Sequence, residues 1–226
     1  MKTSEILKLT LPVAFAYIPL GVALGILAAS SGLSLCEALA ISFFVYSGSA
    51  EFLLIAFISA NEALFGIFIT LFLLGFRHFF YTLSLLNELK SLNFLRFYVI
   101  YALSDESFAL LSTYKKDISS GVSRSKKSFH YALLCFLNQF YWIIGCAFGF
   151  LFQKMSKFDY SGIEFSLNAL FIVLACESFK QNPNQKLLLL ALIIGICGFL
   201  FIDKAYMLFL CLIFAVFALL LGKRYV

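Results

Sequence analysis

Four places in the sequence put ionisable side chains inside long apolar stretches. An ionisable group near the centre of a bilayer costs about 2.5–3.5 kcal/mol on insertion scales, so such a group is a functional candidate by default. The chemistry that these groups suggest is binding of a charged ligand or transfer of a proton. The four places are Glu51, the pair Arg77 and His78, the pair Asp105 and Glu106, and Glu177.

Arg77 and Asp105 are expected to form an ion pair. If the loop between their apolar segments turns near Ser91, Arg77 lies 14 residues before the turn and Asp105 lies 14 residues after it. Both are then roughly 21 Å from the turn, at 1.5 Å per residue. Glu51 matches Arg77 less well, at roughly 15 against 24 Å from a turn near Asn61. The alternative is that Asp105 extends towards the membrane surface with its acidic neighbour.

Arg77 lies on a polar face of its predicted helix. By helical spacing it shares this face with Thr70, Leu74, Tyr81 and Ser84. His78 points about 100° away from that face. Since histidine titrates near neutral pH, His78 is a candidate proton-linked group, although a hydrogen bond to a neighbouring helix explains it equally well.

The stretch "YSGSAEF", Tyr46 to Phe52, interrupts an apolar run with small residues. Ser47, Gly48, Ser49 and Ala50 allow the helix to unwind, and Glu51 follows directly. Broken helices in transporters expose dipole ends and unpaired backbone groups that bind the charged ends of zwitterions. The alternative is a packing face of small residues with a glutamate bonded to a neighbour.

Pro19 interrupts the first apolar segment in a different way. It removes a backbone hydrogen bond and is expected to kink the helix near Phe15, which exposes carbonyl groups to a substrate. The candidate substrate-binding residues are therefore Tyr17, Pro19, Tyr46, Ser47, Gly48, Ser49, Glu51, Arg77 and Tyr81. The candidates for proton coupling or ion pairing are His78, Asp105 and Glu106.

The composition requires an integral membrane protein. The 226 residues are 62% hydrophobic and 13% charged, with a mean hydropathy of +0.97. We expect one all-α polytopic membrane domain, residues 1–226, with seven or eight spans because the sixth and seventh apolar segments are short. The segments are Leu9–Ala29, Cys36–Ala60, Ala63–Leu86, Phe94–Thr113, Phe129–Phe152, Ile163–Phe179, Gln185–Ile202 and Ala205–Gly222.

Several function classes are excluded by what the sequence lacks. The longest polar stretch, Tyr114–Lys127, is too short for a soluble catalytic domain. There is no Gly-x-x-x-x-Gly-Lys-Ser/Thr loop, so the chain is not expected to hydrolyse ATP or to need a cofactor. The six cysteines lie in or beside apolar segments without a close pair, and we expect neither a disulfide nor a metal site. The net charge of +5 does not indicate nucleic-acid binding, because the basic residues form no groove with aromatic residues between them.

Basic residues in the loops predict the orientation. With eight spans, eleven lysines and arginines fall on the side of the N-terminus and five on the other, which favours both termini in the cytoplasm. The first apolar run is expected to remain as a span, since its length and its two prolines fit a span better than a signal peptide. Both inferences place the chain in the cytoplasmic membrane as a multi-pass protein.

Two pairs of segments match at nearly constant spacing. "AYIPLGVALG" aligns with "FYWIIGCAFG" at an offset of 124, and "NEALFGIFITLFLLGF" aligns with "NQKLLLLALIIGICGF" at an offset of 123. We expect a duplication with halves at about 9–113 and 129–222, as in secondary transporters, and either a parallel or an inverted arrangement fits. Each half carries a GxxxG motif, interpreted as close helix packing.

The motifs together resemble the large subunit of the AzlC-type branched-chain amino-acid permeases, the azaleucine-resistance proteins. "LPVAFAYIPLGVALG", "YSGSAEF", "GFRHFFYTLSL", "LSDESFAL" and "GIEFSLNALFIVL" occur in the order and spacing of that family, from about Leu11 to Ala175. The family pattern reads YAGAAQF and NxRHxxY. Here Glu51 replaces the glutamine and Gly75 replaces the asparagine.

The resemblance implies export of branched-chain or similar neutral amino acids, together with a small membrane subunit of the AzlD type. Two alternatives come from other classes of protein. One is an intramembrane serine hydrolase that uses Ser49 with His78, although no third group is placed to orient the imidazole. The other is a passive channel lined by Pro19 and the "YSGSA" stretch.

Overall fold

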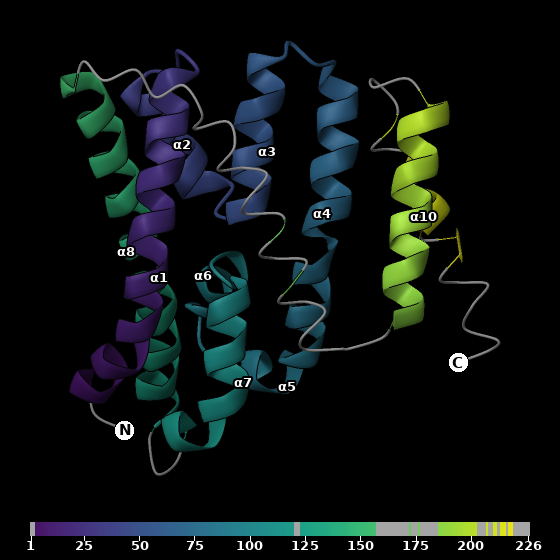
Figure 1. Cartoon of the computed structure of the whole chain (residues 1–226). Helices are drawn as coiled ribbons and strands as arrows, with labels where there is room; N and C mark the ends of the chain where they lie inside the picture. Colours follow the sequence, from purple (N-terminus) through teal and green to yellow (C-terminus); the bar gives the residue numbers. More distant parts are fainter. Residues whose placement is uncertain are drawn as a thin grey trace.

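Long helices form the frame of the protein. The computed structural model describes residues 3–119, 123–156 and 185–202, with a few single residues between 172 and 218. Every regular element in these ranges is a helix, which confirms the predicted all-helical membrane fold. Within the same ranges, three helices are long and apolar enough to cross a bilayer: α1 (Thr3–Ser30), α4 (Leu64–Ser84) and α8 (Arg124–Met155). The shorter apolar helix α10 (Gln185–Phe201) lies beside them (Figure 1).

The second apolar segment is broken, as the small residues predict. α2 (Leu35–Phe44) begins with a capping box between Ser34 and Glu37, and α3 (Gly48–Ser59) begins after a short interruption. Tyr46 lies in that interruption with φ 40°, a conformation that is strained for a side chain of its size. The expected single span Cys36–Ala60 is therefore wrong, because the chain turns back at this point.

The fourth apolar segment is also broken, which the sequence analysis did not predict. α6 (Arg96–Tyr101) follows the short α5 (Leu86–Lys90), and three residues separate α6 from α7 (Asp105–Ser119). The Ser107 N–H donates to Ser104 Oγ at 3.2 Å, and two carboxylates occupy the first turn of α7. A serine cap followed by acidic residues stabilises a new helix start, so the expected span Phe94–Thr113 is wrong.

The two broken segments form hairpins that enter from opposite ends of the molecule (Figure 1). α2 descends along α8 until the Phe43 carbonyl accepts from Gln139 Nε2 at 3.2 Å, and α3 then runs back. The α6–α7 hairpin enters from the other end, where the Asn93 N–H donates to Ser128 Oγ at 2.8 Å. Tyr98 donates to Gln139 Oε1 at 2.7 Å, and α7 then returns to the end where α8 begins. Each hairpin follows a long helix, so α1–α3 and α4–α7 repeat one order of elements in opposite directions.

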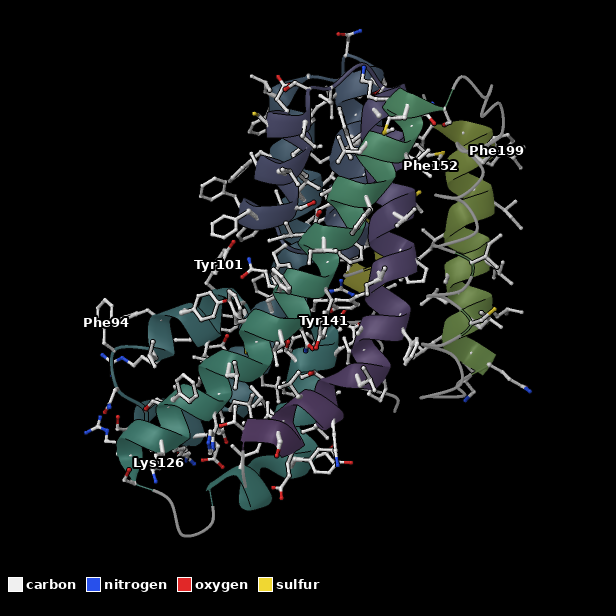
Figure 2. The ribbon with its side chains drawn as sticks, turned by 90° about the vertical axis from the view of Figure 1, so that its left-hand side faces the viewer. Phe94, Tyr101, Lys126, Tyr141, Phe152 and Phe199 are labelled. Carbon is white, nitrogen blue, oxygen red and sulfur yellow. The ribbon has the colours of Figure 1, made fainter. Side chains whose placement is uncertain are left out.

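The tips of the hairpins meet at the middle of α8. In Figure 2, Phe94 and Lys126 lie towards one end of the bundle, Phe152 lies at the other, and Tyr101 and Tyr141 lie between them. Phe43, at the end of α2, and Tyr101, at the end of α6, both contact the side chain of Gln139. Two helix starts, those of α3 and α7, therefore lie at mid-depth, well away from bulk water.

α1 and α8 pack closely and run in the same direction. Their backbones approach at Gly21, Gly25, Gly145 and Gly149, where an added Cβ would overlap backbone atoms of the opposite helix. A Cβ on Gly21 would lie 2.7 Å from the Trp142 carbonyl oxygen, and one on Gly145 would lie 2.6 Å from that of Ile18. The two GxxxG motifs thus act as the close packing face that the sequence predicts.

The shared direction of α1 and α8 fits a parallel relation between the expected halves, although the duplication itself stays a prediction. Much of the second half lies outside the described residues, including nearly all of Ile163–Phe179 with Glu177 and much of Ala205–Gly222.

Adding one methyl group to the α1–α8 contact should destabilise the protein. Gly149→Ala would press a Cβ against the Val22 carbonyl, and overpacking of this kind costs about 1–3 kcal/mol. The measurement is the unfolding temperature in detergent. Gly66→Ala on α4 is the control, since that position faces open space, and it should leave stability unchanged or raised. Equal effects of the two substitutions would contradict the packing.

Candidate functional site

A polar cavity of about 70 Å³ lies where the two hairpin tips, α1, α4 and α8 meet. Eight of the residues predicted as site candidates line it: Tyr17, Tyr46, Ser47, Gly48, Arg77, His78, Asp105 and Glu106. Leu20, Ser104 and Trp142 complete the lining. The volume is far below the roughly 300–1,000 Å³ of small-molecule pockets. In this structure the cavity is therefore too small to hold an amino acid.

Arg77 joins the two hairpins across the cavity. Its Nη1 lies 3.0 Å from Asp105 Oδ2 at the start of α7. This is the ion pair predicted from the equal distances of the two residues from the turn near Ser91. Its Nη2 donates to Ser49 Oγ at 3.1 Å in the first turn of α3. The Tyr81 hydroxyl donates to Asp105 Oδ1 at 2.7 Å, so Arg77 holds one oxygen of the carboxylate and Tyr81 holds the other.

Glu106 lies beside Asp105 and is held by α1. The Tyr17 hydroxyl donates to Glu106 Oε2 and lies 2.9 Å from Ser104 Oγ. The Tyr17 ring meets the Trp142 indole edge to face, with 5.4 Å between the ring centroids. The start of α7 is thus tied to α1 by hydrogen bonds and to α8 through Tyr17.

Three buried polar atoms around the cavity have no hydrogen-bond partner among the described residues. They are Tyr46 Oη, Ser47 Oγ and Arg77 Nε. The start of α3 is also uncapped, since Ser47 makes no side-chain cap, whereas Ser104 caps α7. Buried polar groups are nearly always paired in folded proteins. This cavity therefore presents donors that a polar ligand could satisfy.

Four predicted site residues do not line the cavity. The Pro19 side chain is exposed on the outer face of α1, which continues through both of its prolines, and Leu20 lines the cavity instead. Ser49 and Tyr81 contact the cavity only through Arg77 and Asp105. Glu51 is fully buried behind Trp142, whose Nε1 donates to it at 3.0 Å.

The structure does not bring together the serine and histidine of the hydrolase hypothesis. Ser49 Oγ accepts from Arg77, while His78 Nδ1 lies 3.0 Å from the Gly75 carbonyl within the same helix. In the described residues, His78 therefore forms its hydrogen bond within its own helix. Ser49 has no base beside it that could remove its proton.

Sequence reasoning missed Ser104 and Trp142, and one signal could have found the first. The motif Tyr-x-x-Ser-x-Glu occurs twice, as Tyr46-x-x-Ser49-x-Glu51 and as Tyr101-x-x-Ser104-x-Glu106, at an offset of 55. Both copies run from a hairpin tip into the first turn of a helix. Trp142 carries no such signal, because an aromatic residue in an apolar helix does not stand out.

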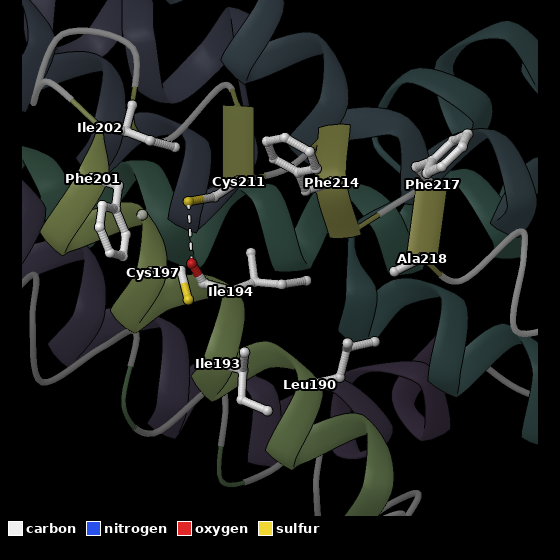
Figure 3. Close-up of a pocket in the computed structure, with 11 residues that line it drawn as sticks. Leu190, Ile193, Ile194, Cys197, Phe201, Ile202, Cys211, Phe214, Phe217 and Ala218 are labelled. Atoms are coloured by element: carbon white, nitrogen blue, oxygen red, sulfur yellow. Dashed lines mark hydrogen bonds between the residues drawn. The ribbon is translucent and has the colours of Figure 1, made fainter.

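A second cavity is larger but apolar. It measures about 490 Å³ and lies between α10 and residues between 211 and 218. Figure 3 shows its wall of aliphatic and aromatic side chains, with Cys211 Sγ bonded to the Ile194 carbonyl at 3.6 Å. None of its lining side chains is charged, so it offers nothing to hold a charged ligand. The polar cavity is therefore the candidate site.

Comparison with known proteins identifies the family. Residues 12–155, the part of the chain that forms both hairpins and the three long helices, match the family described as AzlC protein. The chain belongs to the AzlC family. The matched range contains every residue that lines the polar cavity.

Curated relatives extend this match over most of the chain. The branched-chain amino acid transport protein AzlC of Bacillus subtilis is 31% identical over 177 residues, which are 78% of this chain and 67% of that protein. An uncharacterised membrane protein of Helicobacter pylori strain J99 is 34% identical over 215 residues, 95% of this chain and 92% of its own length. No solved structure matches the chain.

The ion pair of this AzlC protein should show coupling in a double-mutant cycle. Arg77→Ala and Asp105→Ala should each lower stability, and the double variant should lose less than the sum, with a coupling of roughly 0.5–3 kcal/mol. The reason is that removing both charges strands neither of them. Thermal unfolding of the four purified proteins in detergent measures the coupling.

The control cycle combines Arg77→Ala with Glu62→Ala. Glu62 is exposed in the loop before α4, so these two effects should add. Additive losses for the Arg77 and Asp105 variants as well would show that the two charges do not stabilise each other.

Proposed function

We propose that the chain is the large subunit of a secondary transporter that exports branched-chain or similar neutral amino acids through the polar cavity. The observation that carries the proposal is the set of unpaired polar groups at the meeting point of two opposed hairpins. A binding site formed by broken helices at mid-depth is the arrangement found in secondary transporters. The similarity to a branched-chain amino acid transport protein supports the substrate class.

The cavity can recognise both ends of a zwitterion. A carboxylate fits the uncapped first turn of α3, with Arg77 Nε and Ser47 Oγ as further donors. An ammonium group fits the acidic start of α7, where Asp105 and Glu106 lie. The two helix starts come from opposite directions, so a ligand held between them would contact both hairpins at once. An apolar side chain would then lie against Leu20 and Trp142.

The small size of the cavity supports a carrier. With about 70 Å³ of space, an amino acid enters only if a hairpin tip moves. A passive channel would instead need a continuous open path. The two classes differ in kinetics, because a carrier saturates and counter-exchanges its substrate while a channel does neither.

The basic residues support a cytoplasmic N-terminus more strongly than the eight-span arrangement did. Because α2 and α3 form a hairpin, α4 runs back to the end where α1 starts, and Lys90 and Arg96 lie at that end. Among the described lysine and arginine side chains of α1 to α8, Arg77 of the cavity apart, that end holds Lys8, Lys90, Arg96, Arg124, Lys126 and Lys127, and the other end holds Lys154. We further propose a small membrane subunit of the AzlD type as partner.

Export should be visible in cells fed dipeptides. Cells that lack this chain and its small partner should accumulate leucine, isoleucine, valine or methionine inside after uptake of dipeptides that contain them. The measurement is the internal amino-acid pool over time, compared with cells in which both subunits are restored. Unchanged pools for all four amino acids would count against the function.

A bulky residue at the start of α3 should abolish transport without preventing insertion. A Cβ on Gly48 would lie 3.2 Å from the Trp142 ring, so Gly48→Leu would fill the small cavity. Gly66→Leu, in open space on α4, is the matched control and should transport normally. Both proteins should reach the membrane in equal amounts. Normal transport by Gly48→Leu would place the substrate site elsewhere.

A further inference from the structure

Glu51 is a buried carboxyl group that does not contact the polar cavity. Its side chain is fully buried in the first turn of α3, and it is not among the residues that line the cavity. One oxygen accepts from the Ser47 N–H at 2.9 Å, and the other accepts from Trp142 Nε1 at 3.0 Å. In the part of the chain that the structure describes, the ion pair is Arg77–Asp105, and Glu51 has no cation within 4 Å.

A carboxylate in this position is poorly compensated. Two hydrogen-bond donors offset part of the cost of removing the charge from water, but a buried carboxylate without a cation normally takes up a proton instead. Asp105 differs, because it keeps a guanidinium partner and is partly exposed to the cavity. Glu106 differs as well, because it lies in the cavity with its tyrosine donor.

A neighbouring hydroxyl provides the acceptor that a protonated Glu51 needs. Ser42 on α2 is fully buried beside the Glu51 carboxyl, close enough for its hydroxyl to interact with it. A proton on Glu51 can point at this oxygen while both existing donors stay in place. The same hydroxyl can donate to the carboxylate, so Glu51 keeps a partner at Ser42 whether or not it carries the proton.

We propose that Glu51 is a proton-binding site that couples amino-acid export to proton movement. This inference rests on the proposed function. In the closed form Glu51 holds a proton between α2, α3 and α8. When the α2–α3 tip moves away from Trp142 and the site opens to the cytoplasm, the carboxyl releases that proton to cytoplasmic water and substrate binds. When the site opens to the other side, substrate leaves and the carboxyl takes a proton from the water there, so each cycle moves a proton inward as substrate moves outward.

Other titratable groups surround Glu51, and the test has to separate them from it. Cys146 on α8 and Tyr101 on α6 each interact electrostatically with Glu51. The groups on the cavity side are Tyr17 on α1, Arg77 and His78 on α4, and Asp105 and Glu106 on α7. Cysteine and tyrosine normally ionise well above neutral pH, so His78 and Glu106 are the groups that need controls.

The protein carries its own probe for this site. Trp142 is the single tryptophan of the chain, and its indole donates directly to Glu51. We expect the tryptophan emission of the purified protein in lipid nanodiscs to change in one step as the pH is varied. Glu51→Gln should lose this step, whereas Glu106→Gln and His78→Gln should keep it. A Glu51→Gln protein that shows the same step as the unaltered protein overturns the proposal.

Infrared spectroscopy gives a second reading that does not need transport. The difference spectrum between low and high pH should contain the carbonyl band of a protonated carboxylic acid, and Glu51→Gln should lose it. If Glu51→Gln does not fold, Glu51→Asp decides the question, because it keeps the acid but should move the band and the midpoint of the emission change. An unmoved band and midpoint overturn the proposal.

Transport separates failure of this inference from failure of the proposed function. In liposomes containing the chain and its small partner, a pH gradient should speed efflux of labelled leucine by the unaltered protein. Glu51→Gln should still exchange leucine for leucine but lose the acceleration. If the unaltered protein moves no leucine, the proposed function fails, while emission and infrared titrations still decide whether Glu51 binds a proton. Acceleration that survives in Glu51→Gln overturns the coupling role.

Discussion

The close contact between α1 and α8 is the interaction on which the site depends. Glycines on both helices let the two backbones touch, and the contact fixes Tyr17 against Trp142. Those two rings hold opposite hairpins, since Tyr17 binds the start of α7 and Trp142 binds the start of α3. A wider spacing between α1 and α8 would separate the hairpin tips. The charged cavity between the tips therefore depends on the glycine contact between α1 and α8.

The second constraint is that two helix breaks lie where water cannot satisfy the backbone. α8 supplies hydrogen-bond partners for the two breaks from a short polar run in an otherwise apolar helix. Gln139 bonds the Phe43 carbonyl and two tyrosines, and Asn138 donates to Ser107 at 3.0 Å. Side chains of α8 therefore form hydrogen bonds with polar groups at both helix breaks. This fits the burial of the two helices, since the most apolar stretch of α8 is 50% buried and that of α4 only 6%.

Part of this arrangement could be predicted from the sequence. Small residues around Gly48 weaken a helix locally, so the first break was visible, whereas the second depends on a Ser104 cap that looks like ordinary helix without its partners. The Arg77–Asp105 pair was found although α7 begins at Asp105, because distance from the turn is little changed by a break at mid-depth. The surroundings of Glu51 could not be foreseen, since Ser42 and Trp142 reach it through tertiary packing.

The dependence of both hairpins on α8 also sets an order for biosynthesis. Chains are made from the N-terminus, so α2–α3 and α6–α7 leave the ribosome before Gln139 and Trp142 exist. Neither hairpin can be stable alone in lipid, because its broken end exposes unpaired backbone groups. Each must therefore wait in the insertion machinery or at the membrane surface until α8 enters beside α1. A nascent chain that stops short of α8 would hold four of its apolar segments but no site.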